Sequence, residues 1–218
     1  MSQSTYNIAR FAMNRYLDKI LPQVPAEQHA QVQGLFDAHM RRIAEYCDHE
    51  FMEKPVLTTA FIRWLHKIIS PDGQQKLRRH EKWHLVVYCI PGNYKTLPNS
   101  IPGMDIVFTE PHLVKSEMEA LVNTYNADIA NHKWDEAIRN RVLQFIIDFL
   151  IIHPFGDENG RVACMLADLM LVKKNIKPVH FYIAPETAIQ ELSKQLSIHK
   201  TISPLLDFIR EYRADALS

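Results

Sequence analysis

The chain has 218 residues, of which 47% are hydrophobic and 23% charged, so its length allows one domain or one domain with a small extension. Its formal net charge is zero, whereas a nucleic-acid partner usually requires a basic excess, so we expect no nucleic-acid binding. The three cysteines are scattered and odd in number, which argues against a disulfide framework and favours a reducing compartment.

The sequence carries no pattern of a secretory signal peptide at its start. Its longest apolar run, residues 142–152, is interrupted by Asp148 and is too short to span a bilayer. We therefore expect a cytoplasmic protein with no membrane partner. A specialised secretion system would leave no such mark, so delivery into another cell stays open.

Apolar residues at helical spacing predict helices over residues 5–20 and 26–47. Thr58 or Thr59 is suited to cap a third helix that runs to residue 69. A Ser-Pro-Asp-Gly turn cluster ends that helix.

The pattern then changes to short β-prone runs over residues 85–90 and 104–108. Pro98, Pro102 and Gly103 lie in the middle of this stretch, which is typical of an exposed edge and not of a core sheet. We therefore expect residues 84–109 to form a hairpin or a loosely paired flap.

Helical periodicity returns in the second half of the chain. The predicted helices cover residues 113–125, 134–152, 160–174, 186–197 and 203–213. The sequence therefore predicts a mainly α fold with one short β-hairpin flap.

A polar loop, His-Pro-Phe-Gly-Asp-Glu-Asn-Gly-Arg at residues 153–161, separates two apolar helices. His153 has the side chain best suited to accept a proton from a hydroxyl near neutral pH. Asp157 and Glu158 each offer a carboxylate to a hard cation, and magnesium needs only one or two of these.

The end of this loop offers groups that bind anions. Asn159 is a good residue to cap the next helix, and the N–H groups at a helix start favour phosphate. Arg161 lies in the first turn, where a cation is more easily explained if an anion shares the site. Each residue taken alone has an equally good structural interpretation, but together they indicate a site for phosphate chemistry.

The loop resembles the Fic motif, His-x-Phe-x-(Asp/Glu)-Gly-Asn-Gly-Arg-x-x-Arg, of the Fic family of nucleotidyl-transfer enzymes. The matching residues are His153, Phe155, Asp157, Asn159, Gly160 and Arg161. Residues 92–95 and 108–111 resemble the two ends of the family's flap, and residues 177–183 resemble the segment after the motif helix. The resemblance implies a Fic (Fido-fold) helical domain over residues 55–212, preceded by an N-terminal helical extension over residues 1–54.

Two positions depart from the motif: Glu158 replaces its first glycine and Cys164 replaces its last arginine. A glutamate beside an anion site should weaken phosphate binding unless a cation neutralises it. No complete copy of the family's inhibitory helix sequence is found in the chain. Self-inhibition of the usual kind is therefore not expected. Cys164, flanked by apolar residues, is interpreted as an inert buried thiol.

The resemblance implies transfer of AMP from ATP, with Mg²⁺, to a hydroxyl of a target protein. His153 would act as the base and Arg161 would hold the leaving phosphates, while Asp157 would hold the metal. The resemblance implies nucleotide-binding roles for Gly156, Glu158, Asn159, Gly160 and Arg161. It implies target docking on the flap by Tyr94, Lys95 and Thr96.

Two other functions remain open at this stage. The same fold could transfer another phosphate-containing group, such as phosphocholine or phosphate, which the departures at Glu158 and Cys164 favour. A non-catalytic Fic-fold binding protein is the second, although binding alone would not require a base beside an anion site. A homodimer also stays open, because relatives sometimes hide their site in dimers.

Overall fold

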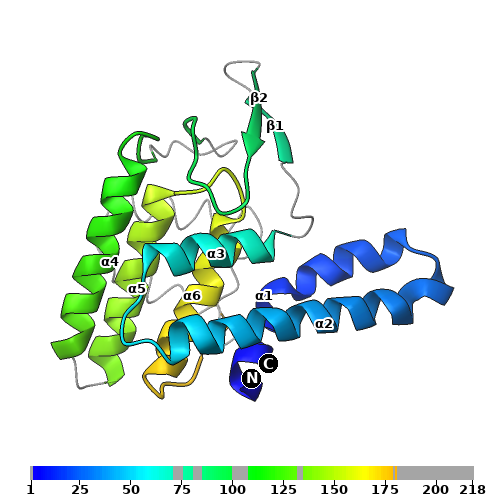
Figure 1. Cartoon of the computed structure of the whole chain (residues 1–218), viewed down its shortest axis with the longest axis horizontal. Helices are drawn as coiled ribbons and strands as arrows, with labels where there is room; N and C mark the ends of the chain where they lie inside the picture. Colours follow the sequence, from blue (N-terminus) through cyan, green and yellow to red (C-terminus); the bar gives the residue numbers. More distant parts are fainter. Residues whose placement is uncertain are drawn as a thin grey trace.

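The structure is a computed structural model of the whole chain (Figure 1). It describes residues 2–70, 76–80, 85–99, 108–131, 135–178 and 180. Within these residues, six α-helices and a two-stranded antiparallel sheet make up the fold. The described part of the chain is mainly helical, as the sequence predicts.

The first two helices form a hairpin that projects to one side of the molecule (Figure 1). Helix α1 (Gln3–Ile20) begins where the Ser2 hydroxyl accepts a hydrogen bond from the Thr5 N–H at 3.1 Å. Two short 3₁₀ turns lead into α2 (His29–Cys47), which packs along α1 and ends in a π-helical turn, Asp48–Met52.

The body of the molecule is built around α6 (Asn159–Lys173). This helix contacts α1, α3 (Thr59–Ile69) and α5 (Asp135–Ile152), and α5 in turn contacts α4 (Val114–Asn131). From Val162 to Leu171 the helix is apolar almost all round, which is typical of a helix at the centre of a core. The core therefore forms around the helix that follows the polar loop.

One buried carboxylate interrupts this apolar helix. The two oxygens of Asp168 accept the backbone N–H of His180 at 2.9 Å and contact its Nδ1 at 3.0 Å. A buried carboxylate needs such partners. The pair ties the segment after α6 back to the core.

The sheet consists of β1 (Lys76–His80) and β2 (Leu85–Cys89), paired so that Lys76 faces Cys89 and His80 faces Leu85. The strand expected at 85–90 is thus confirmed, but its partner in the described residues is an earlier strand that the sequence did not predict. Charged residues dominate β1, so its composition gave no strand signal. The second expected strand, 104–108, lies almost wholly outside the described residues.

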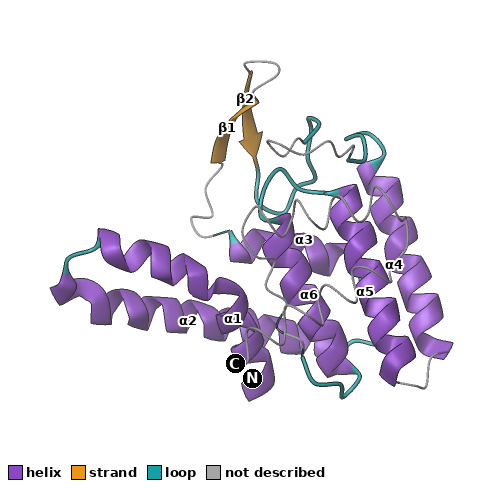
Figure 2. Cartoon of the chain, turned by 180° about the vertical axis from the view of Figure 1, so that it is seen from behind, coloured by secondary structure: helices purple, strands orange, loops and turns teal. Residues whose placement is uncertain are grey.

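The hairpin and the connecting loops lie together at one end of the helical body (Figure 2). The loops at this end include the segment after β2, the segment before α4 and the loop between α5 and α6. The expected flap region and the polar loop are therefore brought to the same place.

Most predicted helices are confirmed within a few residues. Thr58 caps α3, since its Oγ1 accepts from the Phe61 N–H at 3.1 Å, and α4 runs to Asn131, six residues beyond the expected end. The helices expected at 186–197 and 203–213 lie outside the described residues. Among the helices that the structure describes, none is long and apolar enough to cross a bilayer.

The fold predicts that truncating a side chain in α5 costs far more than truncating one on α2. Phe145 is fully buried, so Phe145→Ala should lower the free energy of unfolding by about 3–5 kcal/mol. Leu35 is 67% exposed, so Leu35→Ala should change it by less than about 0.5 kcal/mol. Urea denaturation of the two variants measures both values, and equal losses would contradict this assignment of the core.

Candidate active site

His153 is the first residue after α5 and has a left-handed backbone, with φ of 49°. Histidine is among the few residues enriched in that conformation. Its N–H donates to the carbonyl of Phe149 at 2.9 Å, and its Nδ1 lies 3.2 Å from the carbonyl of Leu150. The imidazole is therefore fixed by the end of the helix that precedes it.

This contact defines the chemistry of the ring. A carbonyl oxygen only accepts hydrogen bonds, so Nδ1 of His153 carries the hydrogen and Nε2 is the basic nitrogen of the neutral ring. The Phe108 ring packs on the imidazole with the centroids 4.1 Å apart. The geometry thus presents Nε2 as the atom that would accept a proton.

The last carbonyls of α5 are bonded by residues from both ends of the flap region. The Thr109 N–H donates to Ile151 O at 3.3 Å, and Nζ of Lys95 donates to Ile152 O at 3.1 Å. The Lys95 N–H donates to Pro154 O at 2.8 Å. Helix ends leave such carbonyls without helical partners, so the flap segments satisfy the end of the helix that carries His153.

Asn159 closes the loop. Its Oδ1 accepts the Phe155 N–H at 2.9 Å and its Nδ2 donates to Phe155 O at 2.8 Å, while Asn99 donates to the same oxygen at 2.9 Å. Asn159 is almost fully buried. Its expected role as the helix cap is wrong, because Glu158 holds the cap position and Asn159 is already helical.

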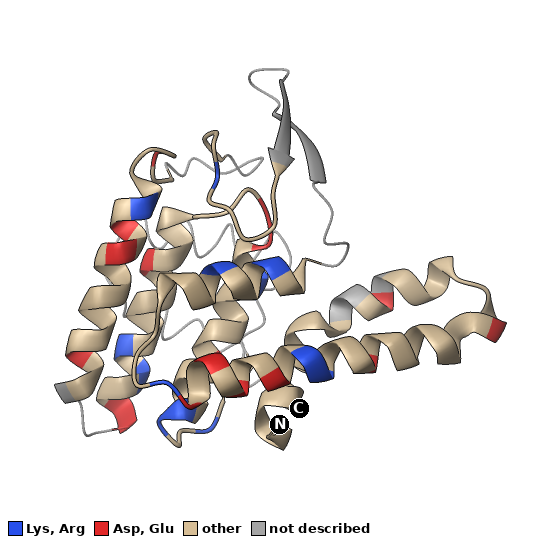
Figure 3. Cartoon of the chain, in the orientation of Figure 1, with Lys and Arg blue, Asp and Glu red and all other residues tan. Residues whose placement is uncertain are grey.

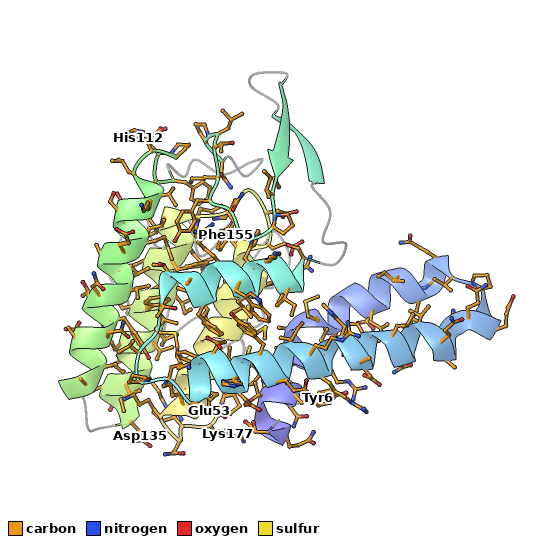
Figure 4. The ribbon with its side chains drawn as sticks, in the orientation of Figure 1. Tyr6, Glu53, His112, Asp135, Phe155 and Lys177 are labelled. Atoms are coloured by element: carbon orange, nitrogen blue, oxygen red, sulfur yellow. The ribbon has the colours of Figure 1, made fainter. Side chains whose placement is uncertain are left out.

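Phe155 is buried in the core and holds the loop there, below the β1–β2 hairpin in the view of Figure 4. Its ring stacks on His66 of α3, with centroids 3.9 Å apart and planes 4° apart. Nδ1 of His66 accepts the Gly92 N–H at 2.8 Å, so this histidine joins the loop to the turn after β2. The sequence analysis missed His66, although its spacing from Ile62 and Ile69 places it on the buried face of α3.

Glu158 stands where the motif has glycine, and its backbone shows why glycine is usual there. The residue has φ of 60° and ψ of 7°, a left-handed conformation that costs an L-residue roughly 1–2 kcal/mol. Its side chain is 4% exposed and its Oε2 lies 2.7 Å from Nε of Arg161. The negative charge that the sequence places beside the anion site is therefore paired with the arginine expected to bind phosphate.

Asp157 lies at the tip of the loop, half-buried, and its Oδ1 accepts the Glu158 N–H at 2.9 Å. No group of three or more metal-binding side chains is found in the part of the chain that the structure describes. A single carboxylate suits a magnesium ion that takes its other ligands from water and phosphate. Asp157 therefore fits a metal that arrives with a nucleotide, and does not form a site that would hold one alone.

The remaining expected site residues lie around this loop. Gly160 is half-buried in the first turn of α6, where backbone N–H groups favour an anion. Tyr94 packs on Phe155 with Arg63 5.5 Å from its ring, and burial raises the pKa of its hydroxyl. Lys95 is buried and Thr96 exposed, so of these three flap residues Thr96 offers its side chain most openly to a partner.

Charge is divided across this end of the molecule. Acidic residues lie in the loop between α5 and α6, whereas α3 and the segment after β2 carry basic ones (Figure 3). Cys164, in the next turn of α6, is half-buried, so the expectation of a buried thiol is wrong.

The fold is a helical domain in which a polar loop that begins with His153 joins two core helices. The sequence model of the Fic/DOC family matches residues 56–171, more than half of the chain. The chain belongs to the Fic/DOC family.

Several solved structures share this fold, among them the following three. A Fic-domain signaling protein from Bacteroides thetaiotaomicron is 20% identical with a TM-score of 0.59, covering 82% of this chain and 67% of that one. Fic-1 from C. elegans is 17% identical with a TM-score of 0.57, covering 89% of this chain and 51% of that one. This chain therefore spans about half of the Fic-1 structure.

The third is BepC from Bartonella tribocorum, a VirB-translocated effector protein with bound AMPPNP. It is 14% identical with a TM-score of 0.53, covering 79% of this chain and 86% of that one. Among curated proteins, none matches this sequence significantly. At these identities the structures establish the shared fold.

The loop predicts a steric dependence between Gly156 and Cys89. A methyl group at Gly156 would overlap the Cys89 Sγ and come within 3.2 Å of the Cys89 Cβ. Gly156→Ala should therefore lower the free energy of unfolding by about 1–3 kcal/mol. In a Cys89→Ala background the same change should cost clearly less.

A double-mutant cycle measured by urea denaturation isolates this coupling. Gly34→Ala is the matched control, because a methyl group there meets nothing within 4 Å. Equal costs of Gly156→Ala with and without the Cys89 thiol would rule out the contact.

Proposed function

We propose that this chain transfers AMP from ATP to a hydroxyl side chain of a target protein. Fic-domain proteins transfer nucleotide-derived groups to proteins, and this chain belongs to that family. The observation that carries the proposal is the Nδ1 contact of His153 with Leu150 O, which makes Nε2 the basic atom of the neutral ring.

In the proposed reaction the target oxygen attacks the α-phosphorus of ATP, and the bond from that phosphorus to the bridging oxygen of the β-phosphate breaks. Nε2 of His153 takes the hydroxyl proton, and pyrophosphate leaves with the bonding electrons. The backbone N–H groups of Gly160 and Arg161 would stabilise the phosphate charge, together with the Arg161 guanidinium. Bound magnesium, held by Asp157, would supply further neutralisation of the phosphates.

Nucleotide binding is supported by the fold match to BepC, whose structure contains AMPPNP. Gly156 and Glu158 are assigned to the nucleotide by their positions within the motif, at one of which Glu158 replaces the usual glycine. For Asn159, the amide is engaged with Phe155, so its contribution would be to hold the loop in shape for the phosphate.

Target docking is proposed at the hairpin end of the molecule. An extended target segment that adds to this region by strand pairing would bring its hydroxyl to the end that carries His153. Four expectations from the sequence remain predictions. They are a cytoplasmic location, delivery into another cell, a homodimer, and the division of the chain into residues 1–54 and 55–212.

A different donor within the same fold is the second candidate. The Glu158–Arg161 pair and the absence of an arginine at position 164 leave less positive charge for a triphosphate than the family motif provides. This favours donors such as a nucleotide-linked phosphocholine, or transfer of phosphate itself.

The transfer is tested with ATP labelled on its α-phosphate, in the presence of magnesium, by autolabelling and by labelling of lysate proteins. His153→Ala should abolish labelling, because it removes the group proposed to take the proton. His49→Ala, which changes an exposed histidine in the π-helical turn after α2, should label at the normal rate. Unimpaired labelling by His153→Ala would falsify the role of His153 as base.

Glu158→Gly should raise the affinity for ATP by about tenfold, since it removes a negative charge and frees Arg161 for phosphate. Glu158→Gln removes only the charge and should give a smaller gain. Calorimetry measures both affinities, and an unchanged or weaker affinity of Glu158→Gly would contradict competition between Glu158 and the nucleotide.

A further inference from the structure

Lys95 donates hydrogen bonds to the residues on both sides of His153. Its Nζ donates to Ile152 O at 3.1 Å, and its backbone N–H donates to Pro154 O at 2.8 Å. The side chain is 6% exposed, so an ammonium group has been taken out of water to make these contacts. Buried lysines are rare unless they have a specific partner.

Lys95 and the imidazole of His153 both lie against the same aromatic ring, that of Phe108. Nζ of Lys95 lies 5.7 Å from the centroid of Phe108, and Phe108 packs on His153 at 4.1 Å. A cation near an aromatic face is attracted to it. Lys95, Phe108 and His153 therefore form one packed cluster, here called the base cluster.

The charge on Lys95 is well placed for this role. The carbonyl that it binds ends α5, where the helix dipole favours a cation, and a hydrogen bond from a charged donor is about twice as strong as a neutral one. The negative charges of Glu110, before α4, and Glu117, in α4, also favour the charged form of Lys95. His153, at the end of α5, is the other titratable member of the base cluster.

We propose that Lys95 is a positioning residue for His153, and that its protonated form holds the imidazole in the orientation for proton transfer. The inference rests on the proposed transfer reaction for its effect on rate, but its effect on the ring does not depend on that reaction.

A pH dependence follows from the burial of the ammonium. Desolvation lowers the pKa of Lys95 from 10.5 to about 8, while Glu110 and Glu117 oppose the shift. Below this pKa the ammonium is intact, and as pH rises through it the hydrogen bond to Ile152 O weakens. The folded state releases this proton more readily than the unfolded chain, so deprotonation of Lys95 does not by itself destabilise the fold.

The test compares Lys95→Met, which removes the charge, with Lys95→Arg, which keeps it at alkaline pH. Lys115→Met, an exposed lysine on α4, is the control for removing a lysine. Protein labelled with ¹⁵N-histidine reports the tautomer of His153 by NMR, and His153→Gln identifies its signals.

The wild type should hold a single Nδ1–H tautomer at pH 7 and lose it between pH 7 and 9. Lys95→Met should show mixed tautomers at pH 7, whereas Lys95→Arg should keep the single tautomer up to pH 9. A tautomer that is unchanged by pH in the wild type and by Lys95→Met would overturn the proposal, and the wild-type titration gives this answer even if a variant fails to fold.

The rate is read from labelling with α-phosphate-labelled ATP. Lys95→Met should lower kcat/KM for ATP by about 10- to 100-fold at pH 7, the size of a misplaced catalytic group. Lys95→Arg should stay within about threefold and should move the alkaline loss of activity to higher pH. An alkaline loss at the same pH in Lys95→Arg would overturn the link to Lys95.

If the proposed AMP transfer is wrong, the experiments give a result that differs from the one expected if the positioning by Lys95 is wrong. If no protein in the series transfers label while the tautomer of His153 still follows the charge on Lys95, the transfer of AMP is rejected and the positioning of the ring by Lys95 is upheld.

Discussion

The end of α5 is the constraint on which the rest of the site depends. Its last four carbonyls, from Phe149 to Ile152, are each bonded by a group outside the helix. His153 itself supplies two of these donors, and the flap region supplies the other two through Thr109 and Lys95. Because an uncompensated buried carbonyl is costly, the orientation of His153 and the position of the flap are fixed together.

A second constraint shapes the loop between the two core helices. It is bracketed by two left-handed residues, His153 and Glu158, which give the chain the sharp turns needed to pass from α5 into α6. Asn159 bonds both polar groups of Phe155 across the loop, and the Phe155 ring is stacked on His66. The loop is thus shaped by its own contacts, and little ordering is left for a ligand to impose.

Much of this could be predicted from the sequence. Helical periodicity located the helices because their apolar faces are long and regular, and the residues of the loop matched a motif whose spacing is specific. The sequence could not reveal β1, because strand pairing is a tertiary property and its residues are mostly charged. Nor could it reveal the pairing of Glu158 with Arg161, which depends on a left-handed backbone at residue 158.

The roles of His66 and Lys95 could not be predicted from the sequence, and the physical reason is the same for both. His66 lies 87 residues before His153 in the chain, and Lys95 acts on a backbone carbonyl and not on a side chain. Contacts that depend on distant segments or on main-chain atoms leave no local pattern. The expected helix cap at Asn159 failed for a related reason, since its amide is used to close the loop.

The packing of the N-terminal helical hairpin, α1 and α2, has a consequence for which part of the chain can fold alone. Ile8, Ala9 and Met13 of α1 are buried in the same cluster as α5 and α6, and α1 lies directly against α6. A fragment that begins at residue 55 would expose this face of the central helix to water and would tend to aggregate. The hairpin is therefore part of the cooperative folding unit that supports the loop, although it lies outside the segment matched by the family.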